Sequence, residues 1–122
     1  MSVKKQRAKI SISIGRDDKG VPDKIIWHAT DNPDGPKKQE CKAMLLSLFD
    51  KDQKDTIKVD LWTKDMMVDE MDRFFFQTLR SLADTYYKAT QNNKLASQMQ
   101  QFTTFFGQET GVLPKPGEEE KK

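Results

Sequence analysis

Apolar and polar residues alternate with a period of two in the first half of the chain. Residues 10–14 read Ile-Ser-Ile-Ser-Ile, an alternation typical of a strand with one buried face. Residues 24–30 (KIIWHAT) predict a second strand, and the glycine- and proline-containing residues 15–22 between them predict a turn. The same alternation recurs in residues 56–62, where one side is formed by Ile57, Val59 and Leu61. We therefore expect an N-terminal β-hairpin and a later strand.

The segment from residue 39 to residue 50 (QECKAMLLSLFD) is ambiguous between strand and helix. Its central residues have good helix propensity, but the run is short and leads into the polar residues 51–55, which predict a turn. We favour a strand over residues 43–49, paired antiparallel with residues 56–62 and preceded by one helical turn at most. Residues 31–38 (DNPDGPKK) predict a surface loop.

After Trp62 the apolar period changes from 2 to 3.6, which predicts a long helix capped by Asp65 or Asp69. Its apolar stripe consists of Met71, Phe75, Thr78, Leu79, Leu82 and Tyr86. Residues 90–93 (TQNN) end this helix, and Asn92 or Asn93 can cap a second one. The second apolar stripe consists of Leu95, Met99, Phe102 and Phe106. The element order predicts an α+β fold, a four-stranded antiparallel sheet followed by two C-terminal helices on one side of it.

Length and composition indicate one domain. The chain has 122 residues, of which we expect residues 9–112 to form a single α+β domain, with a disordered basic N-terminus (residues 1–8) and a disordered tail (residues 113–122). A net charge of +2, from 21 basic and 19 acidic residues, argues against a nucleic-acid partner. We expect a cytoplasmic protein without membrane insertion, because no apolar run is long enough for a secretory signal or a membrane span.

Candidate catalytic residues are few. His28 and Cys41 are the one histidine and the one cysteine, and a catalytic cysteine needs a positioned base. We interpret His28 as a half-exposed strand residue instead. Residues 50–55 begin like a calcium loop, but Lys54 and Asp55 occupy positions that require a ligand and a glycine. The sequence therefore predicts no catalytic, metal or cofactor site, and no enzyme.

Large apolar residues outside the helical stripe are the candidates for a protein interface. A chain with 33% charged residues has a small interior, so some of these side chains are expected at a subunit interface or in an exposed groove. For the stripe residues, packing in the core is the competing interpretation, and it is the one we favour. The interface candidates are Trp62, Met66, Met67, Phe76 and Tyr87.

Four segments carry a resemblance to a known family: DKIIWHATD (residues 23–31), KAMLLSLFD (42–50), DLWTKDMMVDEMDRFF (60–75) and QTLRSLADTYYKAT (77–90). They resemble the gliding motility protein GldC family of Bacteroidetes and related bacteria. The resemblance extends over most of the chain. It implies a small cytosolic accessory protein of the gliding apparatus, which is linked to type IX protein secretion, with no enzymatic activity. The order of strands and helices is also similar to that of the export chaperone SecB.

Two functions follow as hypotheses. The first is a non-catalytic, homo-oligomeric adaptor that binds other proteins of the gliding and secretion machinery. The alternative is a SecB-like chaperone that binds unfolded export clients in an exposed apolar groove. Both hypotheses place the function on exposed apolar surfaces.

Overall fold

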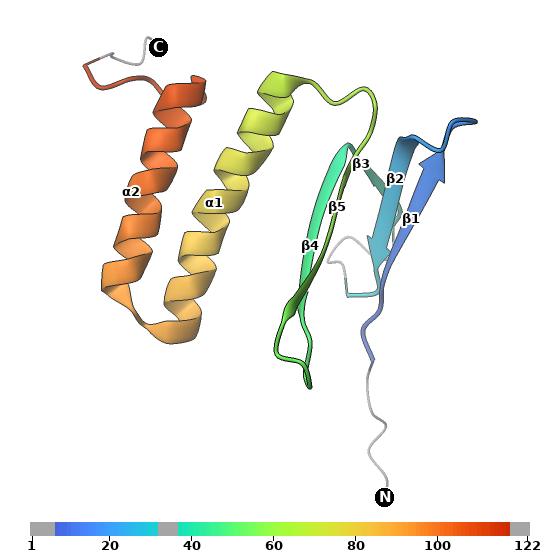
Figure 1. Cartoon of the computed structure of the whole chain (residues 1–122), viewed down its shortest axis with the longest axis horizontal. Helices are drawn as coiled ribbons and strands as arrows, with labels where there is room; N and C mark the ends of the chain where they lie inside the picture. Colours follow the sequence, from blue (N-terminus) through green and yellow to red (C-terminus); the bar gives the residue numbers. More distant parts are fainter. Residues whose placement is uncertain (1–6, 32–36, 118–122) are drawn as a thin grey trace, which may run out of the picture. The chain divides into compact units, whose positions relative to one another are not determined.

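The computed structural model describes residues 7–31 and 37–117 and divides the chain into two compact units, Met1–Met66 and Met67–Lys122. The first unit contains the strands and the second contains two helices (Figure 1). The α+β class and the two C-terminal helices are thus as the sequence predicts. The expectation of a disordered N-terminus falls largely outside the described residues, as do parts of the expected loop 31–38 and of the tail.

Three strands of the first unit form one antiparallel sheet in the order β1-β2-β3. They are β1 (Ile10–Arg16), β2 (Pro22–Ala29) and β3 (Gln39–Cys41). The isoleucines of β1 lie opposite Ala29, Trp27 and Ile25 of β2, so apolar residues share one face of the sheet. Ile25 is completely buried at the centre of that face. The predicted N-terminal hairpin is confirmed.

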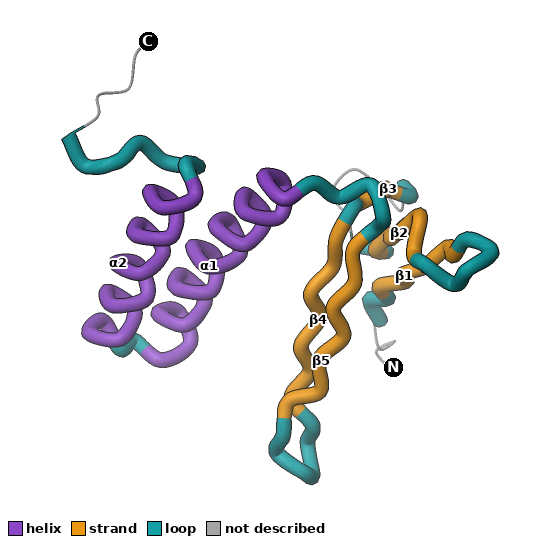
Figure 2. The backbone as a smooth tube through the Cα atoms, turned by 45° about the horizontal axis from the view of Figure 1, so that its top comes forward, coloured by secondary structure: helices purple, strands orange, loops and turns teal. Residues whose placement is uncertain are grey.

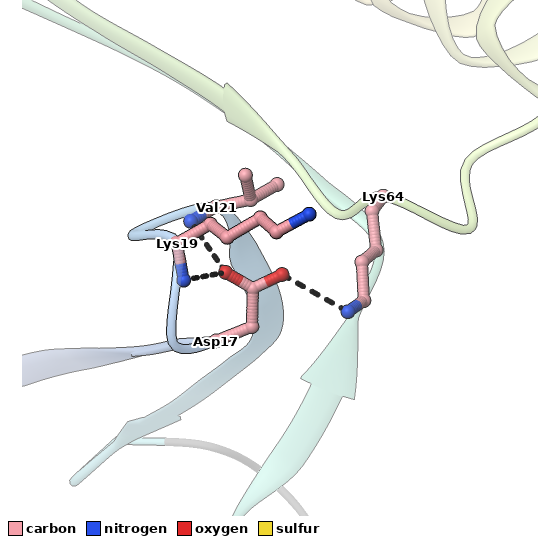
Figure 3. A network of polar contacts seen from close by, with 4 residues as sticks. All are labelled: Asp17, Lys19, Val21 and Lys64. Carbon is pink, nitrogen blue, oxygen red and sulfur yellow. Dashed lines mark hydrogen bonds and ion pairs between the residues drawn. The ribbon is translucent and has the colours of Figure 1, made fainter.

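The turn between β1 and β2 is organised by the carboxylate of Asp17 (Figure 3). Oδ1 of Asp17 accepts hydrogen bonds from the backbone N–H groups of Lys19 and Val21, both at 2.9 Å. Oδ2 accepts a charge-assisted hydrogen bond of 3.0 Å from Nζ of Lys64, which follows the last strand. One carboxylate therefore fixes a turn and ties it to a segment 47 residues later in the chain.

These bonds make the first unit sensitive to acid. The N–H of Val21 and then the ammonium of Lys64 lower the pKa of Asp17 from its ordinary value of 3.8. A carboxyl group with a lowered pKa stabilises the fold above its unfolded pKa, and this stabilisation is lost as the pH falls through the folded value. We expect Asp17→Asn to lower the urea midpoint at pH 7 and to have progressively less effect below the ordinary value of 3.8. A midpoint difference that is the same at every pH would contradict this role for the charge.

The remaining strands, β4 (Ala43–Phe49) and β5 (Thr56–Trp62), form a separate antiparallel hairpin. Figure 2 shows the two strands side by side, extending from the three-stranded sheet toward their common turn. In the turn, Oδ2 of Asp50 accepts hydrogen bonds from the N–H groups of Asp52 (3.1 Å) and Gln53 (2.7 Å), and Lys54 adopts a positive φ of 57°. The predicted strand at residues 43–49, its pairing and the turn are all confirmed.

The prediction of a single four-stranded sheet is wrong, because the described residues contain five strands in two sheets. The difference lies in residues 39–49, where the chain changes partners at Lys42. Gln39–Cys41 pairs with β2, whereas Ala43–Phe49 pairs with β5. The carbonyl of Lys42, at the bend, accepts a hydrogen bond of 2.8 Å from the N–H of Thr63. A short strand therefore occupies the place where we allowed for a helical turn.

The second unit is a helical hairpin of α1 (Val68–Thr90) and α2 (Asn93–Thr110). Neither Asp65 nor Asp69 caps α1 as predicted: the N-cap residue is Met67, whose N–H donates to Oε1 of Glu70 at 3.0 Å. Asn92 caps α2, as predicted, by accepting a hydrogen bond from the N–H of Leu95. Beyond α2, the N–H of Leu113 donates to the carbonyl of Gly107 at 2.9 Å, so the first residue of the predicted tail packs on the helical unit.

Candidate functional site

Small residues and one aromatic ring fill the contact between α1 and α2. Its buried residues are Phe76, Ala83, Ala96, Thr103 and Gly107. Small side chains allow two helices to approach closely, and they leave no room for larger ones between the axes. The sequence-based expectation that the stripe of large apolar residues is the core of α1 is therefore wrong within this unit, since Phe75 and Leu82 of that stripe are exposed.

Other large side chains of the two predicted stripes line an apolar groove on the helical hairpin, which we call the helical groove. It is lined by Leu79, Tyr86, Leu95, Gln98, Met99, Phe102 and Thr103. No lining residue is charged, and the ring of Phe102 is 53% exposed. The rings of Phe105 and Phe106 lie with their centroids 6.3 Å from that of Phe102. The groove thus combines residues of both predicted stripes.

A second apolar surface lies on the β4–β5 hairpin, and we call it the hairpin face. Three cross-strand pairs form it: Met44–Leu61, Leu46–Val59 and Leu48–Ile57. All six side chains point to one side, because residues two apart in a strand share a face. None of the six is buried within the structure, and Leu48 and Ile57 are more than half exposed.

The opposite side of the same hairpin is mixed in character. Lys58 and Asp60 form an ion pair of 2.9 Å there, as neighbours two residues apart on β5. Trp62 lies on this side, opposite Ala43, and its side chain is exposed. The predicted sidedness of residues 57–62 is therefore confirmed, and only one side of the hairpin presents an uninterrupted apolar surface.

The five interface candidates from the sequence occupy different environments. Trp62, Met67 and Tyr87 are exposed, Met66 is partly exposed, and their role as contact residues remains a prediction. Phe76 is different: it is 5% exposed, beneath the guanidinium of Arg80 at 5.1 Å from the ring centroid. We expected Phe76 on the surface because it falls outside the stripe, but the contact between the helices uses the neighbouring face, and Phe76 is core.

The two candidate catalytic residues do not face each other. Cys41 lies directly opposite Ile25, so the two side chains share one face of the sheet. His28 is three residues from Ile25 on the same strand and therefore points to the other face. Burial raises the pKa of the Cys41 thiol, which disfavours the nucleophilic thiolate. This geometry does not bring a cysteine nucleophile and a histidine base together.

Residues 7–31 and 37–117 contain no group of three or more histidine, cysteine, aspartate or glutamate side chains that could hold a metal ion. Neither described helix is long and apolar enough to cross a membrane. The candidate site is thus made of surfaces suited to protein contacts, the helical groove and the hairpin face.

Comparison with known families shows which family the chain belongs to. A family model described as gliding motility-associated protein GldC-like matches residues 22–111, well over half of the sequence. The chain belongs to this GldC-like family. The matched segment begins at the first residue of β2 and ends just after α2, so it includes both the hairpin face and the helical groove. No curated protein and no solved structure matches the chain significantly.

Proposed function

We propose that this chain is a non-catalytic accessory protein of the gliding motility machinery, which is linked to type IX protein secretion. In this proposal it acts in the cytoplasm as an adaptor and binds another protein of the apparatus through the helical groove. Membership in the GldC-like family supports the motility part. The uncharged groove lined by large, half-exposed side chains supports the binding part, because contiguous apolar surface of this kind is characteristic of protein-binding sites.

The groove is suited to an amphipathic helix of the partner. Helix-in-groove recognition uses apolar side chains of the partner spaced at i, i+3/i+4 and i+7, which enter an apolar groove such as the one lined by α1 and α2. Affinity in such interfaces is concentrated in a few large anchor residues. Phe102 is the largest exposed side chain of the groove, so it is the residue whose replacement is expected to matter most.

The test is a pair of phenylalanine variants in a gliding bacterium whose own gene of this family has been replaced. Phe102→Gln is expected to reduce colony spreading to the level of the gene deletion, because loss of a central anchor weakens binding by roughly 30-fold or more. Phe105→Gln is the matched control, since Phe105 is also exposed on α2 but does not line the helical groove. Protein levels and circular dichroism spectra of both variants must equal those of the wild type.

Two outcomes would count against the proposal. If the deletion strain itself spreads normally, the chain is not needed for motility. If Phe102→Gln spreads normally while the deletion does not, the chain serves motility through another surface.

The hairpin face favours a second candidate function, a SecB-like chaperone for unfolded export clients. The hairpin face consists of six apolar side chains in three adjacent cross-strand pairs. Such an open surface can contact many apolar segments, whereas a pocket selects particular side chains. A holdase is expected to suppress aggregation of a reduced, unfolded model substrate at near-equimolar ratio. Failure to delay aggregation at any ratio would exclude this candidate.

A further inference from the structure

Among the described residues of the first unit, strand β1 is paired along one backbone edge only. The sheet order β1-β2-β3 places β1 at the edge, where Figure 1 shows β2 on one side only. The N–H of Thr30 donates to the carbonyl of Lys9 at 3.0 Å, so the backbone groups of residue 9 face β2. Backbone direction alternates along an antiparallel strand. The N–H and C=O groups of Ile10, Ile12 and Ile14 therefore point outward, away from β2.

This edge lacks the usual protection against pairing with another strand. Edge strands are commonly protected by proline, by charged residues or by a bulge in their centre. Residues 10–14 contain neither a charge nor a proline, and the irregularity in the β1–β2 ladder falls at Gly15 and Arg16, at the end of the strand. The side chain of Ile10 is 71% exposed at the open edge.

The sequence of this edge is a palindrome, Ile-Ser-Ile-Ser-Ile. We propose that β1 of one copy pairs antiparallel with β1 of a second copy about a two-fold axis at Ile12. In this register Ile12 faces Ile12 of the second copy, and Ile10 faces Ile14. The outward-pointing backbone groups of one strand then meet those of the other, and serine faces serine on the opposite side of the sheet.

The residues that flank the isoleucines also fit this register. Lys9 falls opposite Gly15, and Arg16, the last residue of β1, falls opposite Ala8. Neither of these two basic residues faces a like charge of the second copy. A shift of the two-fold axis to Ser13 would place Arg16 against Ile10, and a shift to Ser11 would leave Ile14 against Ala8. The register centred on Ile12 is therefore the one that pairs all three isoleucines with isoleucines.

The result is one continuous sheet across two copies, in which each three-stranded sheet extends the other. Six backbone hydrogen bonds form in the three pairs, and the exposed isoleucine side chains gain neighbours of the same kind. A symmetric interface of this type closes on itself and produces a dimer instead of a filament. The inference does not depend on the motility role, since it concerns only the association of this chain with itself.

The first test replaces Ile12 with proline in the full chain. Because the N–H of Ile12 points away from β2, Ile12→Pro removes a donor to the second copy without removing a bond between β1 and β2. Light scattering over the micromolar range is expected to show a dimer for the wild type and for the control Ile12→Val. Ile12→Pro is expected to dimerise at least about tenfold more weakly, with an unchanged circular dichroism spectrum. A monomeric wild type, or a folded Ile12→Pro variant that dimerises as strongly as the wild type, would overturn the proposal.

The second test leaves Ile12 unchanged, so it tests the pairing of the two β1 strands even if Ile12→Pro does not fold. In a Cys41→Ser background, Ile10→Cys and Ile14→Cys chains are treated with a short thiol crosslinker, separately and as a mixture. The register places residue 10 next to residue 14 of the second copy, while identical positions lie about 13 Å apart along the strands. Strong crosslinking of the mixture and weak crosslinking of each variant alone are expected. Equal yields in all three samples would overturn the pairing.

Discussion

Replacing Phe76 with alanine is expected to lower the free energy of unfolding by about 3–5 kcal/mol, the cost of deleting a buried aromatic ring. The ring is 5% exposed between the two helices and also contacts the guanidinium of Arg80. Its loss opens a cavity that the small residues Ala83, Ala96 and Gly107 cannot fill, because they already define the distance between the helices. Phe76 is the one large side chain among the buried residues of α1 and α2.

Urea denaturation measures the loss of unfolding free energy in Phe76→Ala. The transition is followed by the helical circular dichroism signal at 222 nm. Phe105→Ala is the matched control, because the same side chain is removed at a position that is 57% exposed. We expect the control to cost about 1 kcal/mol or less. Equal losses for the two variants would show that Phe76 is not the core of the helical pair, and would make its sequence-predicted role at an interface tenable again.

Replacing Gly107 with alanine is expected to destabilise the protein by about 1–3 kcal/mol, although alanine is the better helix former by about 1 kcal/mol. A Cβ atom at residue 107 would lie 2.7 Å from Cε1 of Phe76 and 2.8 Å from Cδ1 of Leu113. Both distances are below van der Waals contact, so the ring and the leucine must shift. We therefore expect the packing clash in Gly107→Ala to outweigh the higher helix propensity of alanine, so that the protein loses stability.

Thermal unfolding of four variants tests this explanation: Gly107→Ala, Leu113→Ala, the double variant and the control Gln101→Ala. Gln101→Ala, an exposed position on the same helix, is expected to leave the midpoint nearly unchanged. Combining Gly107→Ala with Leu113→Ala should cost less than the sum of the two single changes, because the second substitution makes room for the added methyl group. A stabilising Gly107→Ala, or strict additivity, would mean that α2 tolerates a side chain at this position.

The sequence predicts most elements of this fold and both of its β-hairpins, but not the division of the strands into two sheets. The period-two segments at residues 10–14 and 56–62 are strands, and the helical period after Trp62 marks two helices. The sequence gives no sign that the chain changes partners at Lys42. Two short strands that pair with different neighbours have the same composition as one longer strand. The strand count therefore required the structure.

The helical core was misassigned for a related reason. A hydrophobic stripe shows that a helix has an apolar face, but it does not show which element that face contacts. The contact between α1 and α2 is marked instead by Ala83, Ala96 and Gly107, which hydrophobicity patterns weigh lightly. Most residues of the helical groove belong to the two apolar stripes that the sequence predicts. Their gathering into one exposed groove could be seen only once the helices were placed side by side.

The bend at Lys42 also limits how the length of the chain can vary over evolutionary time. Residues 39–41 and 43–49 are fixed in register to different neighbours, with Lys42 alone between them. An inserted or deleted residue must therefore either distort this bend or shift one strand by a residue, which exchanges the two faces of that strand. The polar turns between β1 and β2 and between β4 and β5 each join two strands of one sheet, so a change in length can be absorbed at the tip of the hairpin. Related sequences should therefore align without gaps through this corner and differ in length at residues 17–21 and 50–55.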